Sequence, residues 1–452
     1  MGRRRILLSD EPVDSLAAYE AAGGGAGLRT LADHGPDRIL DELEASGLRG
    51  RGGAGFPTGL KWRSIVAGGP AAGERFVVAN GAEGEPGTFK DRFLVRNNPY
   101  SMLEGLAVSA GVTGARRAYV AVKSSFAVEI ARLSEALVET AEAGWWPDVE
   151  VSIVGGPEEY LFGEEKALLE VIEGEDPLPR QFPPYVYGLF TTSPQMGWSA
   201  GQSLERRDEG ANPTLVNNVE TLANVPAIVS RGAEWFRSIG TSESPGTVLC
   251  TISGDTARHG VEEFEMGTPV GEIIETIGGG VAGGRILRYL LSGVSNPVLR
   301  GDRLATPASH EALSGVGAGL GTGGFIVFDD RTDPIELAHA VSRFLWIESC
   351  GQCPACKLGT EHVTSLLGRA IDTRRVDLGV LSARLNSVND AARCYLPTQE
   401  QRVVGSLLAD VRDGVVGEHR DLLIAPISDL VDGRFVTAER HRSKRPDWTY
   451  PD

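Results

Sequence analysis

Four of the five cysteines of this chain lie in a pattern that suits an iron–sulfur cluster. Cys350, Cys353 and Cys356 have the spacing C-x2-C-x2-C, and Cys394 follows at a distance. A tight turn lets three thiolates hold three corners of a [4Fe-4S] cube, while a remote segment supplies the fourth thiolate. Because such clusters carry single electrons, the pattern indicates one-electron transfer.

Two other interpretations of these cysteines stay open at this point. A structural zinc site could use four thiolates, but such sites usually pair two C-x2-4-C hooks, and a third cysteine at this spacing suits a tetrahedral ion poorly. Alternatively, the thiols bind nothing. The fifth cysteine, Cys250, lies in the strand-like run Val248 to Ile252 and is expected in the core, because free cysteine is among the most buried residue types.

Length and charge restrict the class of protein and its partners. The 452 residues are expected to form two to four domains with an ample core. A net charge of -17 argues against nucleic acid or an anionic membrane surface as the main partner, so an anionic cofactor must meet a local basic patch. The start, MGRRRILLSDEP, lacks the apolar region of a signal peptide. Without an apolar run of roughly 18 to 20 residues, and with few cysteines, we expect a cytoplasmic protein with no direct membrane insertion.

Strand-like and helix-like runs alternate in the first half of the chain. Strands are expected at Phe76 to Ala79, Ala118 to Val122 and Val149 to Val154, with a helix from about Ser125 to Ala143, which favours an α/β fold with mostly parallel strands. Composition then changes after a polar linker. The expected division is a helical N-terminal extension (1–45), an α/β domain (46–240), a small α+β module (246–330), a helical domain (333–430) and a C-terminal tail (431–452).

The helical domain should position the cysteines. Helices are expected near 334–349, starting after Asp333 and Pro334, near 360–371 and near 377–389. A last helix is expected to open with the capping box Thr398-x-x-Gln401. The three-cysteine turn would then lie between two helices, and Cys394 just before another.

A glycine-rich segment, Gly47 to Trp62 (GLRGRGGAGFPTGLKW), could bind an anion. Its glycines leave backbone N–H groups free to approach a phosphate, and Arg49, Arg51 and Lys61 supply positive charge. It matches neither the Walker pattern nor a clean GxGxxG motif, and a flexible surface loop is the alternative.

Three further polar segments could complete a nucleotide site. They read NGAEGEPGTFKDR (80–92), YLFGEE (160–165) and NNVET (217–221). Their acidic and amide side chains can accept hydrogen bonds from ribose hydroxyls and flavin N–H groups, while Lys61, Lys90 and Arg92 could neutralise phosphates. As an alternative, a pair such as Glu164 and Glu165 is often only a solvated face.

Together with the cysteines, these segments resemble a known family in order and spacing. From about Ile39 to Leu423 the chain is similar to the 51 kDa, or F-type, NADH-binding flavoprotein subunit of respiratory complex I and to the diaphorase subunits of NAD-linked hydrogenases and formate dehydrogenases. The resemblance implies a Rossmann-like α/β domain that binds FMN and NADH, a small ubiquitin-like SLBB domain of α+β class, and a C-terminal helical bundle that carries a [4Fe-4S] cluster on the four cysteines.

The resemblance also implies roles for individual residues. Phe56 would stack on the adenine of NADH, Glu85 and Glu165 would face NADH, and Glu85 and Lys61 would be the catalytic pair. The FMN and nucleotide phosphates would meet the backbone of the glycine loop together with Lys61. The loop positions are Gly50, Gly52, Gly53 and Gly55, and the residues that would surround FMN are Asn80, Glu83, Gly84, Tyr160, Gly163, Glu164, Asn217, Asn218 and Thr221.

The function implied is that of an NADH:acceptor oxidoreductase, or diaphorase, subunit. A hydride from NADH would pass to FMN, and its electrons would leave singly through the [4Fe-4S] cluster to a partner subunit, with the reverse direction also open. The expected partners are a thioredoxin-like [2Fe-2S] subunit and a larger redox complex. The alternative is an electron-transfer or scaffold subunit that keeps the cluster but has lost flavin or nucleotide turnover.

Three departures from the family pattern bear on that alternative. Ala82 stands where the family has an aspartate, and Lys166 where it has a threonine, which would bring a cation beside the pocket. Residues 191–212 form an insertion of about 20 residues. The sequence leaves open the terminal acceptor, the choice between NADH and NADPH, and the direction of electron flow.

Overall fold

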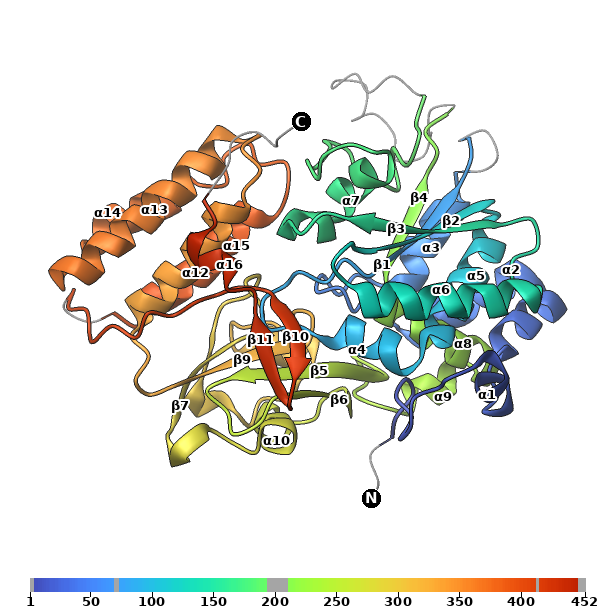
Figure 1. The fold of residues 1–452 in the computed structure, drawn as a ribbon, viewed down its shortest axis with the longest axis horizontal. Helices are drawn as coiled ribbons and strands as arrows, with labels where there is room; N and C mark the ends of the chain where they lie inside the picture. Colours follow the sequence, from blue (N-terminus) through green and yellow to red (C-terminus); the bar gives the residue numbers. More distant parts are fainter. Residues whose placement is uncertain (1–3, 69–72, 193–209, 412–413, 446–452) are drawn as a thin grey trace.

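The computed structural model describes residues 4–68, 73–192, 210–411 and 414–445. Three regions with separate hydrophobic cores lie side by side in Figure 1: an α/β region, a middle region built on a second sheet, and a C-terminal helical region. The cysteines and the glycine-rich segment, which are far apart in the sequence, belong to regions that meet at the centre of the molecule.

A four-stranded parallel sheet forms the centre of the α/β region. Its order is β3-β2-β1-β4, and every neighbouring pair is parallel, which confirms the predicted parallel α/β architecture. The fourth strand was not expected from the sequence. The strands are β1 (Phe76–Asn80), β2 (Arg117–Lys123), β3 (Glu150–Gly156) and β4 (Thr214–Asn218).

Helices cover this sheet on both faces. The tightest contact is between α5 and α8, where a Cβ atom placed on Gly105 would lie 2.0 Å from the carbonyl oxygen of Leu222, so only glycine allows the two backbones to approach so closely. The helices are α1 (Leu16–Ala21), α2 (Ala26–Ser46), α3 (Thr58–Val66), α4 (Lys90–Asn97), α5 (Pro99–Thr113), α6 (Ala127–Glu142), α7 (Glu165–Ile172), α8 (Val219–Arg231) and α9 (Ala233–Arg237).

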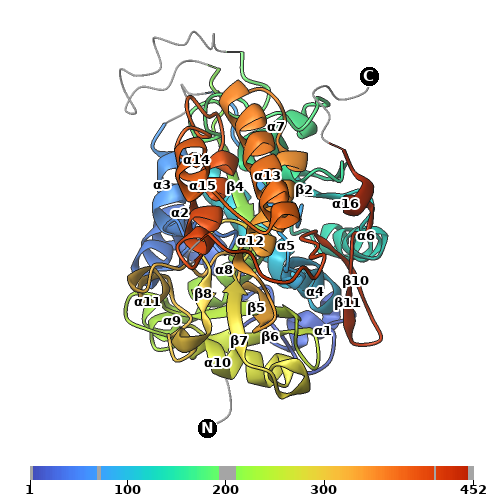
Figure 2. The same ribbon diagram turned by 90° about the vertical axis from the view of Figure 1, so that its left-hand side faces the viewer.

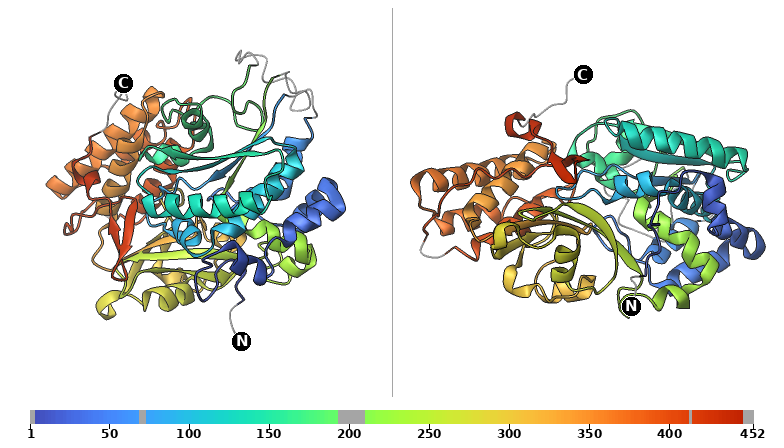
Figure 3. Two further views of the ribbon diagram at one scale, coloured as in Figure 1. Left: turned by 45° about the vertical axis from the view of Figure 1, so that its right-hand side comes forward. Right: turned by 60° about the horizontal axis from the view of Figure 1, so that its bottom comes forward.

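The middle region is a mixed five-stranded sheet in the order β6-β5-β9-β7-β8, seen from below in Figure 3. Cys250 lies in its central part and is fully buried, as expected. The predicted helix at 270–277 is split, because α10 (Val270–Ile273) continues as a π-helical turn (Ile274–Gly278). The strands are β5 (Thr247–Gly254), β6 (Gly260–Glu265), β7 (Leu287–Leu291), β8 (Leu299–Arg300) and β9 (Gly324–Asp329), and a short helix, α11 (His310–Gly315), precedes β9.

Four helices form most of the C-terminal region (Figure 2): α12 (Pro334–Glu348), α13 (Pro354–Thr373), α14 (Leu378–Leu385) and α15 (Leu396–Leu408). The predicted start of α12 is confirmed, because the Asp333 side chain accepts a hydrogen bond of 2.8 Å from the Ile335 N–H. The predicted capping box is wrong: α15 begins at Leu396 with no side-chain cap, and Thr398 lies inside its first turn. No helix in the described ranges is long and apolar enough to cross a membrane.

A hairpin follows these helices and returns to the α/β region. It consists of β10 (Ile427–Val431) and β11 (Arg434–Thr437), and the short helix α16 (Arg440–Ser443) comes next. The Arg92 guanidinium of α4 donates hydrogen bonds to the carbonyl oxygens of Ile427 and Ser428 at 3.0 and 2.9 Å. The hairpin therefore ties the end of the chain to the first domain (Figures 1 and 3).

Candidate functional site

The glycine-rich segment folds into a closed turn. Arg49 and Pro57 form an antiparallel bridge, and the Gly50 N–H donates a hydrogen bond of 2.9 Å to the Phe56 carbonyl. Gly53 and Gly55 have φ angles of 110° and 63°, a region that favours glycine. The turn leads directly into α3, so it is a fixed structure and not the flexible loop considered as an alternative.

The two arginines of this turn hold it together from inside. The Arg49 Nε donates to the Gly55 carbonyl at 2.7 Å, and the buried Arg51 guanidinium donates to the carbonyls of Arg49 and Pro245 at 3.3 Å each. Burial lowers the pKa of Arg51. The Arg51 N–H reaches Thr221 Oγ1 at 2.8 Å. Arg51 therefore lies inward and joins the turn to α8, and does not supply charge at the surface.

Lys61 supplies the accessible charge of this site. Its Nζ lies 2.8 Å from Oε2 of Glu165, the first residue of α7, and the two side chains are 19% and 35% exposed. Phe56, at the tip of the turn, is 56% exposed, which is unusual for a large apolar side chain. The predicted nucleotide residues Phe56, Lys61 and Glu165 are thus all accessible on one part of the molecule.

The carboxyl ends of β1 and β4 bring the predicted amide side chains together. Asn80 and Asn218 are register partners, and the Asn80 Nδ2 donates to the Gly163 carbonyl at 2.9 Å. Asn217 accepts a hydrogen bond of 2.8 Å from the indole of Trp62. A Cβ atom on Gly52 would lie 3.2 Å from the Cβ of Asn218, which places the glycine turn against this edge. Ligands of open α/β sheets bind at such strand ends.

Glu83, Lys90 and Arg92 have partners inside the protein instead. The Glu83 carboxylate accepts hydrogen bonds from the Asp91 N–H at 3.0 Å and from the Arg92 Nε at 2.9 Å, and this ion pair is buried. Lys90 Nζ lies 2.6 Å from Asp91 and 2.8 Å from Glu220. Burial opposes its charge, but the two carboxylates outweigh burial and raise the pKa of Lys90. The expectation that Lys90 and Arg92 neutralise phosphates is therefore wrong, since buried charges must be paired.

Glu85 and Tyr160 form a polar junction between the three regions. The Glu85 carboxylate accepts hydrogen bonds from the Tyr160 hydroxyl at 2.5 Å, the Val294 N–H at 2.7 Å and the Ser295 hydroxyl at 3.1 Å. Gln399 of α15 donates to Tyr160 and Ser295 at 2.9 and 2.7 Å. Burial raises the pKa of Glu85 against these donors. No motif in the sequence pointed to Ser295 or Gln399.

The segment from 160 to 166 changes direction at Glu164. The Glu164 carboxylate caps α7 by accepting hydrogen bonds from the Lys166 and Ala167 N–H groups at 3.0 and 3.1 Å. Burial raises its pKa to about 7. Gly84 also lies beside this segment, because a Cβ atom on it would be 3.7 Å from the Tyr160 Cα.

Two of the family departures have structural explanations. Ala82 is 3% exposed and belongs to an apolar cluster with Phe162 and Leu168. Lys166 does not point into the nucleotide site, as the sequence suggested: its Nζ donates to the carbonyl of Arg393, the residue before Cys394. Most of the expected insertion, 193–209, lies outside the described residues.

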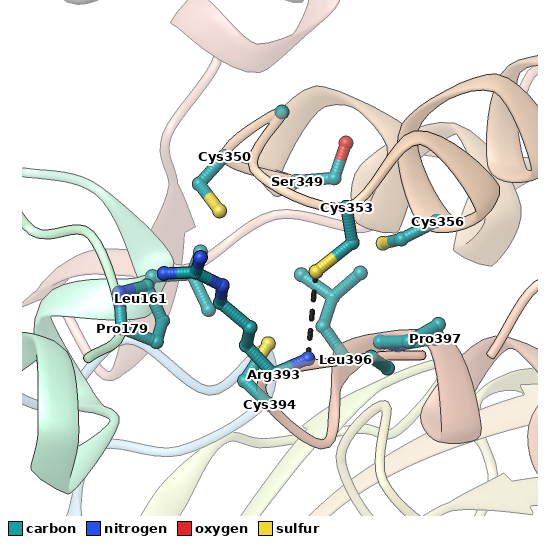
Figure 4. A pocket seen from close by; sticks show the side chains of 12 residues that line it. Leu161, Pro179, Ser349, Cys350, Cys353, Cys356, Arg393, Cys394, Leu396 and Pro397 are labelled. Carbon is teal, nitrogen blue, oxygen red and sulfur yellow. Dashed lines mark hydrogen bonds between the residues drawn. The ribbon is translucent and has the colours of Figure 1, made fainter. Parts of the chain in front are cut away.

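The four predicted cysteines line one small cavity, with their sulfur atoms turned toward it (Figure 4). Cys350 follows the end of α12, Cys353 is the residue before α13, and Cys356 lies in the first turn of α13. The helix begins earlier than expected, because Pro354 suits its first position. The remaining walls are mostly apolar and include Leu161, Pro179, Leu396 and Pro397.

This cavity suits a cluster with separate corners. In the described part of the chain no three His, Cys, Asp or Glu side chains are close enough together to hold a metal ion, so the thiols surround a space instead of meeting at a point. A [4Fe-4S] cube takes one thiolate at each of four irons. The Arg393 N–H donates to the Cys353 Sγ at 3.4 Å, a contact that stabilises thiolate charge. Burial raises the pKa of Cys394 to about 12, so metal binding must supply the energy of deprotonation.

Comparison with known proteins agrees with both halves of the site. Residues 43–227 match the Nuo51 FMN-binding domain, and residues 336–417 match the iron–sulfur binding region of NADH-ubiquinone oxidoreductase F. The predicted FMN and iron–sulfur cofactors are thereby confirmed.

Curated relatives match over most of their length. The chain is 39% identical over 370 residues to the second of two F subunits of NADH-quinone oxidoreductase in Rhizobium meliloti (strain 1021), which covers 78% of this chain and 82% of the relative. It is 33% identical over 395 residues to the NADH-quinone oxidoreductase F subunit of Streptomyces coelicolor (strain ATCC BAA-471 / A3(2) / M145), covering 84% and 83%.

Solved structures of an NAD+-reducing [NiFe]-hydrogenase are also similar. In the air-oxidized state the TM-score is 0.71 at 33% identity, covering 86% of this chain and 64% of that chain. In the H2-reduced state the TM-score is 0.74 at 32% identity, covering 95% and 69%. The chain thus spans about two thirds of the hydrogenase chain that it matches. From the fold, the two sites and these relatives together, the chain belongs to the family of NADH-quinone oxidoreductase F subunits.

Proposed function

We propose that this chain oxidises NADH and delivers the electrons singly to a partner subunit. FMN, when bound, accepts two electrons and releases them one at a time, which is the chemistry needed between NADH and a [4Fe-4S] cluster. One observation carries the proposal: residues 160–166 contact both sites. Glu165 pairs with Lys61 beside the glycine turn, while Leu161 lines the cysteine cavity and Lys166 bonds to the Arg393 carbonyl.

The glycine turn and Lys61 would bind the phosphates. The left-handed conformations at Gly53 and Gly55 place neighbouring backbone groups on the outside of the turn, and Lys61 adds a positive charge at its base. The exposed ring of Phe56 suits stacking on adenine, which removes apolar surface from water. The assignments carried by resemblance remain proposals for this site: Gly50, Gly52, Gly53, Gly55, Phe56, Lys61, Asn80, Gly84, Glu85, Tyr160, Gly163, Glu164, Glu165, Asn217, Asn218 and Thr221.

Glu83 would act indirectly. Its carboxylate holds the start of α4 through Asp91 and Arg92, so it positions the backbone of 82–84 and does not reach a ligand with a free oxygen. Glu85 differs, because its carboxylate lies at the junction of three regions beside Tyr160. A buried carboxylate of raised pKa at that point can hold a proton near the site of hydride transfer.

The four thiolates of Cys350, Cys353, Cys356 and Cys394 would hold the cluster. Apolar walls from Leu161 and Leu396 exclude water from it, and the Arg393 N–H offsets charge on the Cys353 sulfur. Burial and N–H donors are two of the means by which proteins set cluster potentials.

The finer architecture and partners follow from the same interpretation. We assign 1–45 to a helical extension, 46–240 to a Rossmann-like FMN/NADH domain, 246–330 to a ubiquitin-like SLBB domain, 333–430 to a helical bundle around the cluster, and 431–452 to a C-terminal tail. The chain would act in a larger NADH-quinone oxidoreductase or NAD+-reducing hydrogenase assembly, next to a thioredoxin-like [2Fe-2S] subunit and on the cytoplasmic side. The relatives' names and the mixed sheet of the middle region support these assignments.

An anaerobic visible spectrum of the purified chain tests the proposal. Acid-extracted flavin and iron are counted first, with about one FMN and four irons per chain expected. Addition of NADH should then bleach the flavin band. Iron without flavin, and no response to NADH or NADPH, would instead support a cluster-carrying subunit without nucleotide turnover.

A further inference from the structure

Lys166 connects the nucleotide side of the molecule to the cysteine cavity. It is the second residue of α7, directly after Glu165, and its Nζ donates a hydrogen bond to the Arg393 carbonyl. The peptide that accepts this bond leads into Cys394. The Lys166 side chain is only 15% exposed, so water screens its charge incompletely.

Two further observations place this cation within electrostatic reach of the cluster ligands. The Cys394 thiol has its pKa raised by burial and by Glu164, while Lys166 acts in the opposite direction. The Glu164 carboxylate lies 3.9 Å from Lys166 Nζ, so Lys166 also offsets a negative charge beside Cys394. Arg393 itself donates its N–H to the Cys353 sulfur, which places the bonded peptide between two ligands.

We propose that Lys166 raises the reduction potential of the cluster held by Cys350, Cys353, Cys356 and Cys394. Reduction adds one electron to a group that already carries net negative charge with its four thiolates, and a fixed cation stabilises the reduced form more than the oxidised form. Loss of the cation would also leave Glu164 without its partner, and that change acts in the same direction. The inference rests on the proposed cluster site.

Three substitutions separate charge from structure. Lys166→Arg keeps both the charge and a donor to the Arg393 carbonyl, Lys166→Gln keeps a donor without the charge, and Lys166→Met keeps neither. Arg369→Gln is the matched control, because it removes an exposed positive charge from α13 thirteen residues beyond Cys356, roughly 20 Å along the helix at 1.5 Å per residue.

The measurement is an anaerobic potentiometric titration of the cluster, followed by electron paramagnetic resonance, with iron counted in every sample. We expect Lys166→Gln and Lys166→Met to keep the wild-type iron content and to disfavour reduction by up to about tenfold, or 59 mV for one electron, while Lys166→Arg and Arg369→Gln keep the wild-type potential. Unchanged potentials in the Gln and Met variants with full iron would overturn the inference. Loss of iron from both would also overturn it, since Lys166 would then only hold the loop. A wild-type chain without iron would instead reject the proposed cluster site itself.

Discussion

The Tyr160 hydroxyl donates a hydrogen bond of 2.5 Å to the Glu85 carboxylate, across 75 residues of sequence. This bond favours the ionised form of Glu85, whereas burial raises the pKa of that group. Tyr160→Phe should therefore raise the pKa further. If NADH oxidation requires ionised Glu85, the acid limb of the pH profile of kcat/KM will move to higher pH, which a steady-state assay with an artificial acceptor can measure.

Two control variants test the origin of such a shift. Ser295→Ala removes another donor to Glu85 and should move the acid limb in the same direction. Tyr119→Phe removes a hydroxyl from β2, away from Glu85, and should leave the profile in place. A profile that is identical in wild type, Tyr160→Phe and Ser295→Ala would show that Glu85 does not titrate in the reaction.

Lys61 should be needed for flavin binding. Removing it with Lys61→Met should weaken FMN binding by at least about tenfold, because a hydrogen bond to a charged group contributes about 1.5–3 kcal/mol. Fluorescence titration of flavin-depleted protein with FMN measures the affinity. Arg63→Met, two residues along the same helix, removes only a cation that pairs with Asp41 and Glu44 on the outer side, and should leave the affinity unchanged. Equal affinities in both variants would remove Lys61 from the site.

The cysteines should divide into four that bind iron and one that does not. Cys394→Ser should lower the iron content and the visible absorption of the purified protein, because it removes the one ligand that comes from a remote segment. Cys250→Ala is the matched control, since Cys250 is fully buried in β5. It should keep the full iron content, even though the lost packing makes the protein less stable. Iron loss in Cys250→Ala but not in Cys394→Ser would contradict the assignment.

Local patterns predicted the elements that carry the chemistry, but not how their side chains are used. The alternation of strands and helices indicated the parallel sheet, and the spacing of Cys350, Cys353 and Cys356 indicated the cavity that they line with Cys394. These features depend on neighbours in sequence. The start of α15 was misplaced because Thr398 offers a plausible cap that the chain does not use.

Long-range contacts account for the larger errors. Lys90 and Arg92 resembled free cations for phosphate, yet Glu220 and the hairpin carbonyls, which are distant in sequence, bind them. Lys166 was expected beside the nucleotide, but its partner is the peptide of Arg393, 227 residues away. No spacing rule reports such pairs, because they arise only when separate regions pack together.

Glu348, at the end of α12, should stabilise the junction between the C-terminal segment and the α/β region. Its buried carboxylate accepts hydrogen bonds from His441, Lys444 and the Tyr160 N–H at 2.9, 2.7 and 2.9 Å. Burial opposes its charge, but these partners outweigh burial and lower the pKa of Glu348 from 4.5 to about 2. Such a shift corresponds to about 3 kcal/mol of stability at neutral pH.

Because this pKa is lowered on folding, the stabilisation is present above about pH 4.5 and is lost as the pH falls toward about 2. Glu348→Gln should therefore lower the free energy of unfolding by about 3 kcal/mol at pH 7, and the difference from wild type should narrow at pH 4 and below. Urea unfolding followed by tryptophan fluorescence measures both. Glu439→Gln removes an exposed carboxylate paired with Arg442 and should cost less than about 1 kcal/mol. A difference between wild type and Glu348→Gln that does not change between pH 7 and pH 4 would mean that lost packing, and not the ionised carboxylate, explains the effect.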